Sequence, residues 1–288
     1  MLFGLSLTER SLALSFGRVL RQNSFPVLIT YSPRGRMQAL MTAPLTWLPS
    51  LLLAPFVGSF LGTLILRLPQ GRDVVWARSE CDTCHSRLAP QDMVPLLSFL
   101  ALRGRCRVCR SPIPRFHLWV ELAAVVIAVW VVTARTNPAL IWSDCILGWA
   151  LLALSWIDLR HFLLPDVLTL PLVLAGLAAT FWLDPSGITD AAAGATIGFL
   201  AFYLVAIGYR ALRGRDGLGQ GDAKLMAAAG AWVGWQGLPP VIVGAACLGI
   251  VFAVFAHLRR PRGRLGDTPI PFGPCIALAL FVVRLYSV

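Results

Sequence analysis

The chain has 288 residues, of which 57% are hydrophobic and only 14% are charged, and its mean hydropathy is +0.72. This composition lies outside the range of soluble globular domains, so the chain is predicted to cross a membrane several times. The formal net charge of +11 would suit nucleic-acid binding in a soluble protein. Here the arginines lie between apolar runs, which indicates a membrane-lipid surface and no nucleic-acid partner.

Residues 1–42 contain several arginines ahead of the first apolar run and no continuous apolar core of the kind found in signal peptides. Two interpretations of this N-terminal extension remain open. In one, translation begins downstream of residue 1, with Met37 or Met41 as the candidate start. In the other, the segment is a peripheral, partly amphipathic tail on the membrane surface.

Eight apolar runs follow, and a helix of about 17 to 25 residues is long enough to cross a hydrocarbon core of roughly 30 Å. The sixth run is the shortest and is rich in Gly and Trp. We therefore predict an all-α polytopic membrane protein with about eight transmembrane helices. The predicted spans are 44–66, 118–134, 139–157, 164–183, 189–210, 222–237, 239–257 and 269–286.

Arginine is concentrated in three connections between the predicted spans. With eight spans, these connections and the short one that holds Arg160 fall on the same side, which the positive-inside rule assigns to the cytoplasm. Both termini would then face outward. The predicted domains are the N-terminal extension 1–42, a first transmembrane helix at 43–66, a cytoplasmic loop domain at 67–117 and a transmembrane core at 118–288.

The loop domain contains two C-x-x-C motifs, CDTC and CRVC, separated by 21 residues. Two such turns can bind one Zn²⁺ tetrahedrally, and a zinc with four protein ligands has no open position for water. We therefore predict a structural zinc that holds the loop folded. Two disulfides are the alternative, which a cytoplasmic location disfavours. The predicted ligands are Cys81, Cys84, Cys106 and Cys109, whereas Cys145, Cys247 and Cys275 lie in apolar spans and are interpreted as small buried side chains.

Most of the 14 acidic residues lie in loops, where solvation accounts for them. Asp158 ends the third span on the arginine-rich side, where a carboxylate faces the negative end of the helix dipole. An unfavourable charge at the membrane edge is a candidate for function. Asp222 begins the sixth span from the same side, 64 positions later. Asp166 precedes an apolar run and is interpreted as a helix cap.

The stretch GLGQGDAKL, residues 217–225, surrounds Asp222 with glycines. Glycines at alternating positions, including Gly219 and Gly221, permit backbone with positive φ and the close approach of another chain, so we expect them to position a substrate backbone. Lys224 is interpreted as an interfacial cation, with tuning of the neighbouring carboxylate as the alternative. The competing interpretation of Asp222 is that it only caps the following helix.

If Asp158 and Asp222 meet, two carboxylates in a partly desolvated site would share one proton, as in aspartyl proteases. One carboxylate would take a proton from the attacking water while the other, protonated, polarises the scissile carbonyl. Because the two carboxylates titrate as a coupled pair, the sequence does not assign the proton-accepting and the proton-donating role to one aspartate or the other.

The chain resembles the type IV prepilin peptidases, also called leader peptidase/N-methyltransferases, a family of GxGD-type intramembrane aspartyl proteases. The resemblance runs from about Phe56 to the C-terminus. It includes VGSFLGTLILRLP, the cysteine-bearing loop, Glu121, IDLRHFLLPDVLTLPL, GLGQGDAKL and PFGPCIAL. Two positions depart from the family pattern: Gly62 stands where Asn is frequent, and Asp82 where Pro is usual. Both departures lie near the region linked to methyl transfer.

The resemblance implies an aspartyl endopeptidase of the bacterial inner membrane whose active site faces the cytoplasm. It implies that the enzyme removes the leader peptide of type IV prepilins or pseudopilins after a glycine, with Asp158 and Asp222 as the catalytic pair. It further implies N-methylation of the new N-terminal residue with S-adenosylmethionine, an activity associated with the large cysteine-bearing loop.

Two other classes of function fit part of the pattern. A proton- or cation-coupled transporter could use the same two aspartates, but the sequence shows no inverted repeat. A scaffold of a secretion assembly could use the arginine-rich loop to contact anionic lipid or partner proteins, but this role leaves the two aspartates unexplained.

Overall fold

The computed structural model describes residues 45–74, 80–81, 83–87, 89–214, 219–259 and 271–287, so the predicted N-terminal extension lies outside the described residues. Six helices in the described part are long and apolar enough to cross a membrane, and α10 is a shorter apolar helix. The predicted all-helical, multi-pass fold is therefore confirmed. The helices are α3 (Leu48–Arg67), α5 (Phe116–Ala134), α6 (Pro138–His161), α7 (Asp166–Leu183), α8 (Ile188–Arg213), α9 (Gln220–Arg259) and α10 (Gly273–Ser287).

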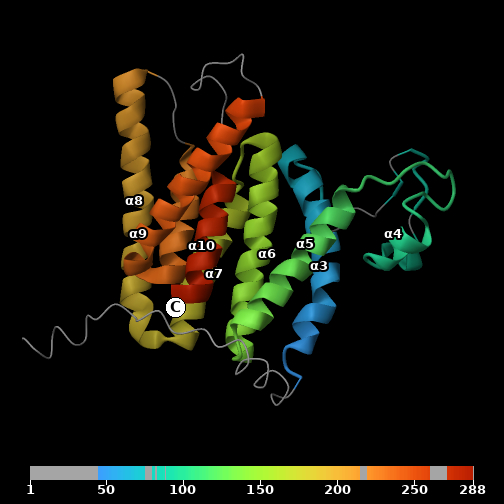
Figure 1. The fold of residues 1–288 in the computed structure, drawn as a ribbon, viewed down its shortest axis with the longest axis horizontal. Coiled ribbons are helices and arrows are strands. Elements are labelled where there is room, and N and C mark those ends of the chain that lie inside the picture. The colour runs from blue at the N-terminus through green and yellow to red at the C-terminus, as the bar shows by residue number, and fades with distance from the viewer. Residues whose placement is uncertain are drawn as a thin grey trace, which may run out of the picture. The chain divides into compact units, whose positions relative to one another are not determined.

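Successive helices run antiparallel, so their ends gather at two levels (Figure 1). The C-terminal ends of α3, α6 and α8, both ends of α9 and the N-terminal end of α10 lie at the upper end in Figure 1. The cysteine-bearing segment between α3 and α5 joins the helices at this same end. It contains the 3₁₀ turns η1 (Leu68–Gln70) and η2 (Pro90–Met93) and the short helix α4 (Leu97–Ala101). The described helix ends that flank the predicted arginine-rich connections therefore lie on one side of the bundle.

The helix α9 contains a break at Gly234, whose φ of 69° and ψ of 175° are not helical. Only glycine adopts this conformation readily, so the chain folds back there and both ends of α9 reach the same end of the bundle (Figure 1). With α9 as two halves and α10 as a short span, the described helices match the eight predicted spans. The predicted break at residue 238 is misplaced, because Pro239 and Pro240 lie in the first turns of the second half, where proline is tolerated.

Small residues let the helices approach closely. A Cβ at Gly230 would lie 2.0 Å from the carbonyl oxygen of Gly194, so α8 and α9 meet backbone to backbone. A Cβ at Gly58 of α3 would lie 2.5 Å from the Cα of Glu121 in α5. Small residues at such crossings are the usual means of helix association in membranes. The second crossing places Glu121 against α3.

The helix α6 lies between α3 and α5 on one side and α10 on the other (Figure 1), and 56% of its most apolar 18-residue window is buried. The corresponding fraction in the other long helices is at most 33%. Asp158 at the C-terminal end of α6 is thus held by the most enclosed helix of the bundle. The apolar faces that the other helices leave exposed are suited to lipid contact.

Asp144 is an exception to the prediction that most acidic residues are solvated in loops. It lies in α6 with no exposed surface and accepts hydrogen bonds from Nε of Arg135 at 2.8 Å and from Nε of Arg284 at 3.0 Å. Arg284 also donates to the carbonyl of Trp232 at 3.0 Å. This buried network joins α6, α9 and α10 through groups that are far apart in the sequence.

Candidate functional site

The structure brings Asp158 and Asp222 together. Asp158 comes from the last turns of α6 and Asp222 from the first turn of α9, and their exposed fractions are 6% and 8%. Both line one cavity of about 260 Å³, and the two carboxylates lie close enough to repel each other electrostatically. The cavity is walled by two short segments of the chain, residues 162–164 after α6 and residues 219–221 at the start of α9.

Asp158 is held by the N-terminal end of another helix. The backbone N–H of Gly273, the first residue of α10, donates a hydrogen bond of 2.9 Å to Oδ2 of Asp158. A helix N-terminus favours negative charge, so α10 offsets the unfavourable position of this carboxylate at the C-terminal end of α6. Sequence reasoning did not identify this role for Gly273. The thiol of Cys275, two residues further along, also lies near both carboxylates.

Asp222 lies inside the first turn of α9 rather than at its N-cap. Asp222 is the third residue of α9, which begins at Gln220. Its backbone N–H donates a hydrogen bond of 3.1 Å to the carbonyl of Gly219, the residue just before the helix. A carboxylate in a first turn still benefits from the helix dipole. The side chain nevertheless lines the cavity that it shares with Asp158, so capping alone does not account for its place.

The glycines near Asp222 differ from the expectation. Neither Gly219 nor Gly221 has a positive φ, and Gly217 lies outside the described residues. A Cβ at Gly221 would lie 2.7 Å from the Cβ of Leu164, so the close approach at this position is made by the same chain. A Cβ at Gly219 would first meet Oδ2 of Asp222 at 3.4 Å. The glycines therefore let the two walls of the cavity close on each other.

Lys224 pairs with Asp166 across the α9 and α7 helices, with Nζ and Oδ1 2.5 Å apart. The interpretation of Asp166 as a helix cap is wrong, because Pro165 occupies the N-cap of α7 and no side chain caps that helix end. Lys224 also lines the cavity of the two aspartates. The ion pair thus ties the start of α9 to the start of α7 beside the cavity.

The four predicted metal ligands form one cluster. The Sγ atoms of Cys81, Cys84, Cys106 and Cys109 all lie within 4.8 Å of one another, and the four thiols are free rather than paired in disulfides. The Sγ atoms of Cys81 and Cys109 are 3.8 Å apart. Four sulfurs bound tetrahedrally to zinc at about 2.3 Å would be separated by about 3.8 Å. The cluster therefore fits a tetrahedral metal ion.

The two C-x-x-C turns are structural repeats of each other. The N–H of Cys81 donates to the carbonyl of Ser86 at 3.0 Å, and the N–H of Cys106 donates to that of Ser111 at 2.9 Å. The hydroxyl of each serine lies 3.0 Å from the second sulfur of its own pair. The repeat C-x-x-C-x-S is visible in the sequence but was not used to predict these serines.

The hydrogen bonds in the first turn favour thiolates, the form that binds metal. The pKa of Cys81 is lowered to about 6, chiefly by the hydrogen bond that its sulfur accepts from the backbone N–H of Cys84. The hydroxyl of Ser86 is the largest contribution that lowers the pKa of Cys84.

Aromatic contacts join the start of α5, which follows the cysteine-bearing segment, to the end of α6 that carries Asp158. Phe116, the first residue of α5, packs edge-on against Trp156 with ring centroids 5.5 Å apart. The guanidinium of Arg160 lies 4.0 Å from the centre of the Phe116 ring. Arg160 is two residues beyond Asp158, so the segment and the aspartates share one end of the bundle.

Comparison with known proteins supports the same grouping. Residues 52–135 match the bacterial peptidase A24 N-terminal domain, and residues 145–254 match the type IV leader peptidase family. The prepilin leader peptidase/N-methyltransferase of Pseudomonas aeruginosa is 34% identical over 261 residues, which cover 83% of this chain and 89% of that protein. The protein of the same name from Stutzerimonas stutzeri is 35% identical over 275 residues, or 87% and 94% of the two chains.

A third relative of the same name, from Burkholderia pseudomallei, is 39% identical over 211 residues, which cover 73% of this chain and 67% of that protein. No solved structure matches the chain. The resemblance inferred from the motifs is thus confirmed by two family matches that together span most of the helical bundle. The chain belongs to the type IV prepilin leader peptidase/N-methyltransferase family.

Proposed function

We propose that Asp158 and Asp222 are the catalytic pair of an aspartyl endopeptidase that removes leader peptides from type IV prepilins or pseudopilins. The single observation that carries the proposal is that two buried carboxylates, far apart in the sequence, line the same small cavity at one end of the bundle. The arginine-rich connections belong to that end, so the active site faces the cytoplasm at the bacterial inner membrane.

The reaction needs one carboxylate in each protonation state. The ionised carboxylate takes a proton from water as the water oxygen attacks the scissile carbonyl carbon, and the protonated carboxylate donates a hydrogen bond to the carbonyl oxygen. When the C–N bond breaks, a carboxyl proton passes to the leaving amine. Burial of both carboxylates and their mutual repulsion in one small cavity disfavour double ionisation, so we expect the pair to share one proton.

The position of the cavity suits the boundary between the basic leader and the hydrophobic helix of such a substrate. A prepilin leader is short and basic, and a hydrophobic helix follows it, so the cleaved bond would lie at the membrane edge. The scissile segment would enter between the walls formed by residues 162–164 and 219–221. The basic leader would remain on the arginine-rich side, where anionic lipid headgroups also attract positive charge.

We further propose that the four-cysteine cluster binds one structural Zn²⁺. All four positions would be filled by protein sulfur, so the ion would have no site for water or substrate. When bound, zinc supplies a fixed tetrahedral junction that joins the two C-x-x-C turns. The cysteines hold residues 81–109 together, and this segment packs on the membrane helices through the hydrogen bond from Leu96 N–H to Glu121 at 2.8 Å.

A second activity, N-methylation of the new N-terminal residue, is proposed from the names of the relatives. When bound, S-adenosylmethionine supplies an electrophilic methyl group, which the N-terminal amine takes up with loss of one proton. The chain has to hold the donor near the amine that cleavage releases. The contacts of Phe116 with Trp156 and Arg160 join the start of α5, which follows the cysteine-bearing segment, to the end of α6 that carries Asp158.

Cleavage of a purified prepilin by the full-length protein in detergent tests the proposal. Asp158→Asn and Asp222→Asn are each expected to lower kcat at least about a hundred-fold, because each removes one partner of general acid–base catalysis. Asp184→Asn, which changes an exposed carboxylate in the same way, is the matched control. Helical content and zinc content should be equal in all variants.

Cleavage that survives either aspartate substitution would remove that residue from the mechanism. If the wild type itself cleaves no prepilin but carries protons across vesicle membranes in a manner that depends on Asp158 and Asp222, the protein is a coupled transporter and the peptidase proposal is wrong.

A further inference from the structure

The cysteine-bearing segment reaches back along the membrane helices at α4. The residue before α4 is Leu96, whose backbone N–H donates a hydrogen bond of 2.8 Å to Oε2 of Glu121 in α5. Glu121 packs on Gly58, where a Cβ would lie 2.5 Å from the Cα of Glu121. Gly58 lies near the middle of α3, a helix of 20 residues that ends at Arg67. At the rise of an α-helix, Gly58 is about 14 Å from that end.

The level of α4 is therefore that of a membrane span and not that of the helix ends. In Figure 1, α4 lies beside the bundle and clearly lower than the C-terminal end of α3. The helix α3 is long and apolar enough to cross a membrane, so its middle lies in the hydrocarbon region. A segment that packs beside the middle of α3 has lipid as its surroundings wherever protein does not cover it.

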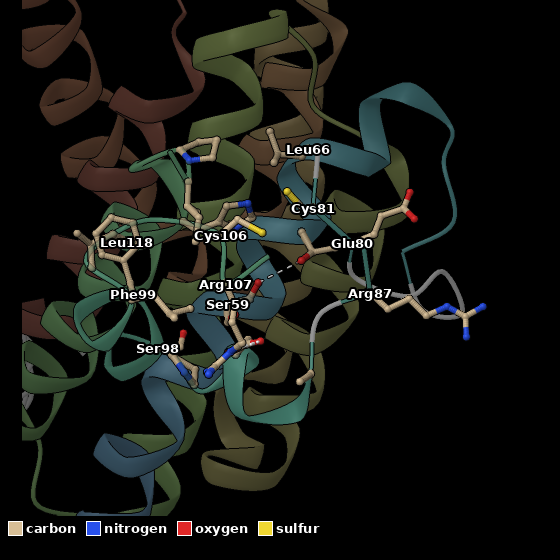
Figure 2. A pocket seen from close by; sticks show the side chains of 18 of the residues that line it. Ser59, Leu66, Glu80, Cys81, Arg87, Ser98, Phe99, Cys106, Arg107 and Leu118 are labelled. Carbon is tan, nitrogen blue, oxygen red and sulfur yellow. Dashed lines mark hydrogen bonds and ion pairs between the residues drawn. The ribbon is translucent and has the colours of Figure 1, made fainter. Parts of the chain in front are cut away.

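The inner face of α4 packs on the rest of the protein. Ser98 and Phe99 line a cavity of about 750 Å³ between α3, α5 and the cysteine-bearing segment, and Glu121 forms part of its wall. Figure 2 shows Ser98 and Phe99 among the side chains around this cavity, with Ser59 of α3 and Leu118 of α5. The ring of Phe99 is also covered by the chain that follows α4, because a Cβ at Gly104 would lie 2.9 Å from it.

The outer face of α4 is apolar and uncovered. Leu97 and Leu100 are each 66% exposed, and Ala101 is exposed beside them. These three residues leave no polar side chain on the outer face of the helix. A helix face that meets water is normally polar, whereas a face that meets lipid is apolar. The composition of this face thus agrees with the level at which α4 lies.

The backbone around α4 is also suited to a bilayer, where each N–H must find its partner within the protein. The N–H groups of Leu97 and Ser98 donate to the carbonyls of Pro95 and Val94. After the helix, the donors are Leu102, Arg103, Gly104 and Arg105, and their acceptors are the carbonyls of Ser98, Leu100, Phe99 and Leu102. Irregular backbone at membrane depth is tolerated where it is satisfied in this way and lines a cavity.

The chain leaves α4 through two arginines. Arg103 and Arg105 are both exposed, and residues 97–105 contain no acidic side chain. Long arginine side chains that start below the headgroups extend toward them, and anionic headgroups attract their charge. Apolar residues followed by unopposed arginines therefore match the acyl chains and the headgroups of one leaflet.

We propose that α4 is a re-entrant element that inserts into the leaflet on the arginine-rich side of the bundle. Leu97 and Leu100 contact lipid acyl chains, and Arg103 and Arg105 contact anionic headgroups. The helix lies between the two C-x-x-C turns, so the cluster that joins these turns also closes the stretch that carries α4. The inference goes beyond the proposed peptidase, because it depends on the packing of α4 and not on the reaction at the aspartates.

Fluorescence quenching in lipid nanodiscs that contain phosphatidylglycerol tests the inference on the full-length, zinc-containing protein. A small fluorescent amino acid replaces Leu100, and the quenchers are a phospholipid with a nitroxide on its acyl chain and iodide in the water. The lipid-facing control carries the label at Leu174, which is also 66% exposed and lies near the middle of α7. The water-facing control carries it at Leu212, which is 87% exposed in the last turn of α8.

The label at Leu100 should behave like the label at Leu174. Its quenching by the nitroxide lipid should agree within about twofold with that at Leu174, because an inserted helix buries its apolar face several ångströms into the acyl region. Iodide should quench it much less than it quenches the label at Leu212. Strong quenching by iodide with little by the lipid would place α4 in water and overturn the inference. A label shielded from both quenchers would show that protein, such as a second copy of the chain, covers α4, and would also overturn it.

A charge on the outer face should expel α4 from the bilayer. Leu97→Glu is expected to lower the nitroxide quenching of the label at Leu100 and to raise its quenching by iodide, since a charged side chain is costly at this depth. Leu97→Met keeps an apolar side chain of similar volume and should change neither value. Equal quenching in both variants would contradict lipid contact at Leu97.

Helical content and zinc content are measured in each labelled protein. If Leu97→Glu alters either of them, the comparison of the labels at Leu100, Leu174 and Leu212 decides. Prepilin cleavage by the aspartate variants bears only on the peptidase proposal, so the two proposals can fail separately.

Discussion

Gly273 and Asp158 are 115 positions apart in the chain, yet the backbone N–H of the glycine donates a 2.9 Å hydrogen bond to the aspartate carboxylate. The contact leaves no room for a side chain, because a Cβ on Gly273 would lie 2.7 Å from Oδ2 and 3.3 Å from the Cβ of Asp158. The N-terminal end of α10 therefore sets the position of one member of the proposed catalytic pair.

Gly273→Ala is expected to displace the Asp158 carboxylate and to lower kcat for prepilin cleavage by about ten- to a hundred-fold, since small misplacements of catalytic groups cost rates of this order. Helical content should not change. Gly208→Ala is the control, because a Cβ there has nothing within 4 Å, and its kcat should match the wild type. A Gly273→Ala enzyme with the wild-type kcat would show that this contact does not position Asp158 for the reaction.

Gly221 and Leu164 bring the two walls of the aspartate cavity together. Gly221→Ala would place its Cβ 2.7 Å from that of Leu164 and push the walls apart, so cleavage should slow. Adding Leu164→Gly removes the atom that is struck and should restore part of the rate. A double-mutant cycle of kcat/KM measures the coupling, and additive effects of the two changes would contradict the proposed contact.

Removal of zinc should unfold the cysteine-bearing segment and spare the helical bundle. A strong chelator is expected to release one zinc per chain and to expose the segment to trypsin, which cuts after arginine. Arg103, Arg105 and Arg110 are the cleavage sites to monitor by mass spectrometry. Circular dichroism should retain its helical signal.

Cys109→Ser should reproduce the effect of the chelator, because it removes one of the four sulfur ligands. Cys247→Ser is the matched control. This cysteine is exposed on α9, contrary to the expectation that it is buried, whereas Cys145 and Cys275 are buried as expected. Wild-type protein that contains no metal, or a Cys109→Ser variant with full zinc content, would refute the zinc proposal.

The buried network around Asp144 should be important for stability rather than for cleavage. Asp144→Asn would leave the guanidinium groups of Arg135 and Arg284 buried without their carboxylate. Breaking a buried ion pair by removal of one partner typically costs about 3–5 kcal/mol. The variant should unfold in detergent at a clearly lower temperature, whereas Asp184→Asn should not, and equal melting temperatures would contradict this account.

The sequence alone determined the class of the protein and the chemistry available to it. Hydropathy and the clustering of arginine depend on composition along short stretches, so they predict the helices and the common side of their connections. The C-x-x-C pairs are also local, because each turn carries its own two ligands. Asp158 and Asp222 were recognisable as acidic side chains that solvation in a loop does not explain.

Tertiary structure decided which of these groups meet. The chain folds back at Gly234 rather than near residue 238, because the positive φ of this glycine makes the turn while the prolines fit the helix that follows. Gly219 and Gly221 do not adopt the positive φ that was expected of them; instead, their lack of a side chain allows close packing. Such outcomes depend on neighbours that are distant in the sequence, which local patterns do not specify.

The same reason explains why Glu121, Asp144 and Gly273 were not assigned their roles from the sequence. Glu121 becomes the wall of a cavity only because Gly58 lets α3 and α5 touch and because Leu96 returns to it from the cysteine-bearing segment. Asp144 and Gly273 act through partners on other helices. The sequence thus supplies the reactive groups, and the packing of the helices decides which of them face a common cavity.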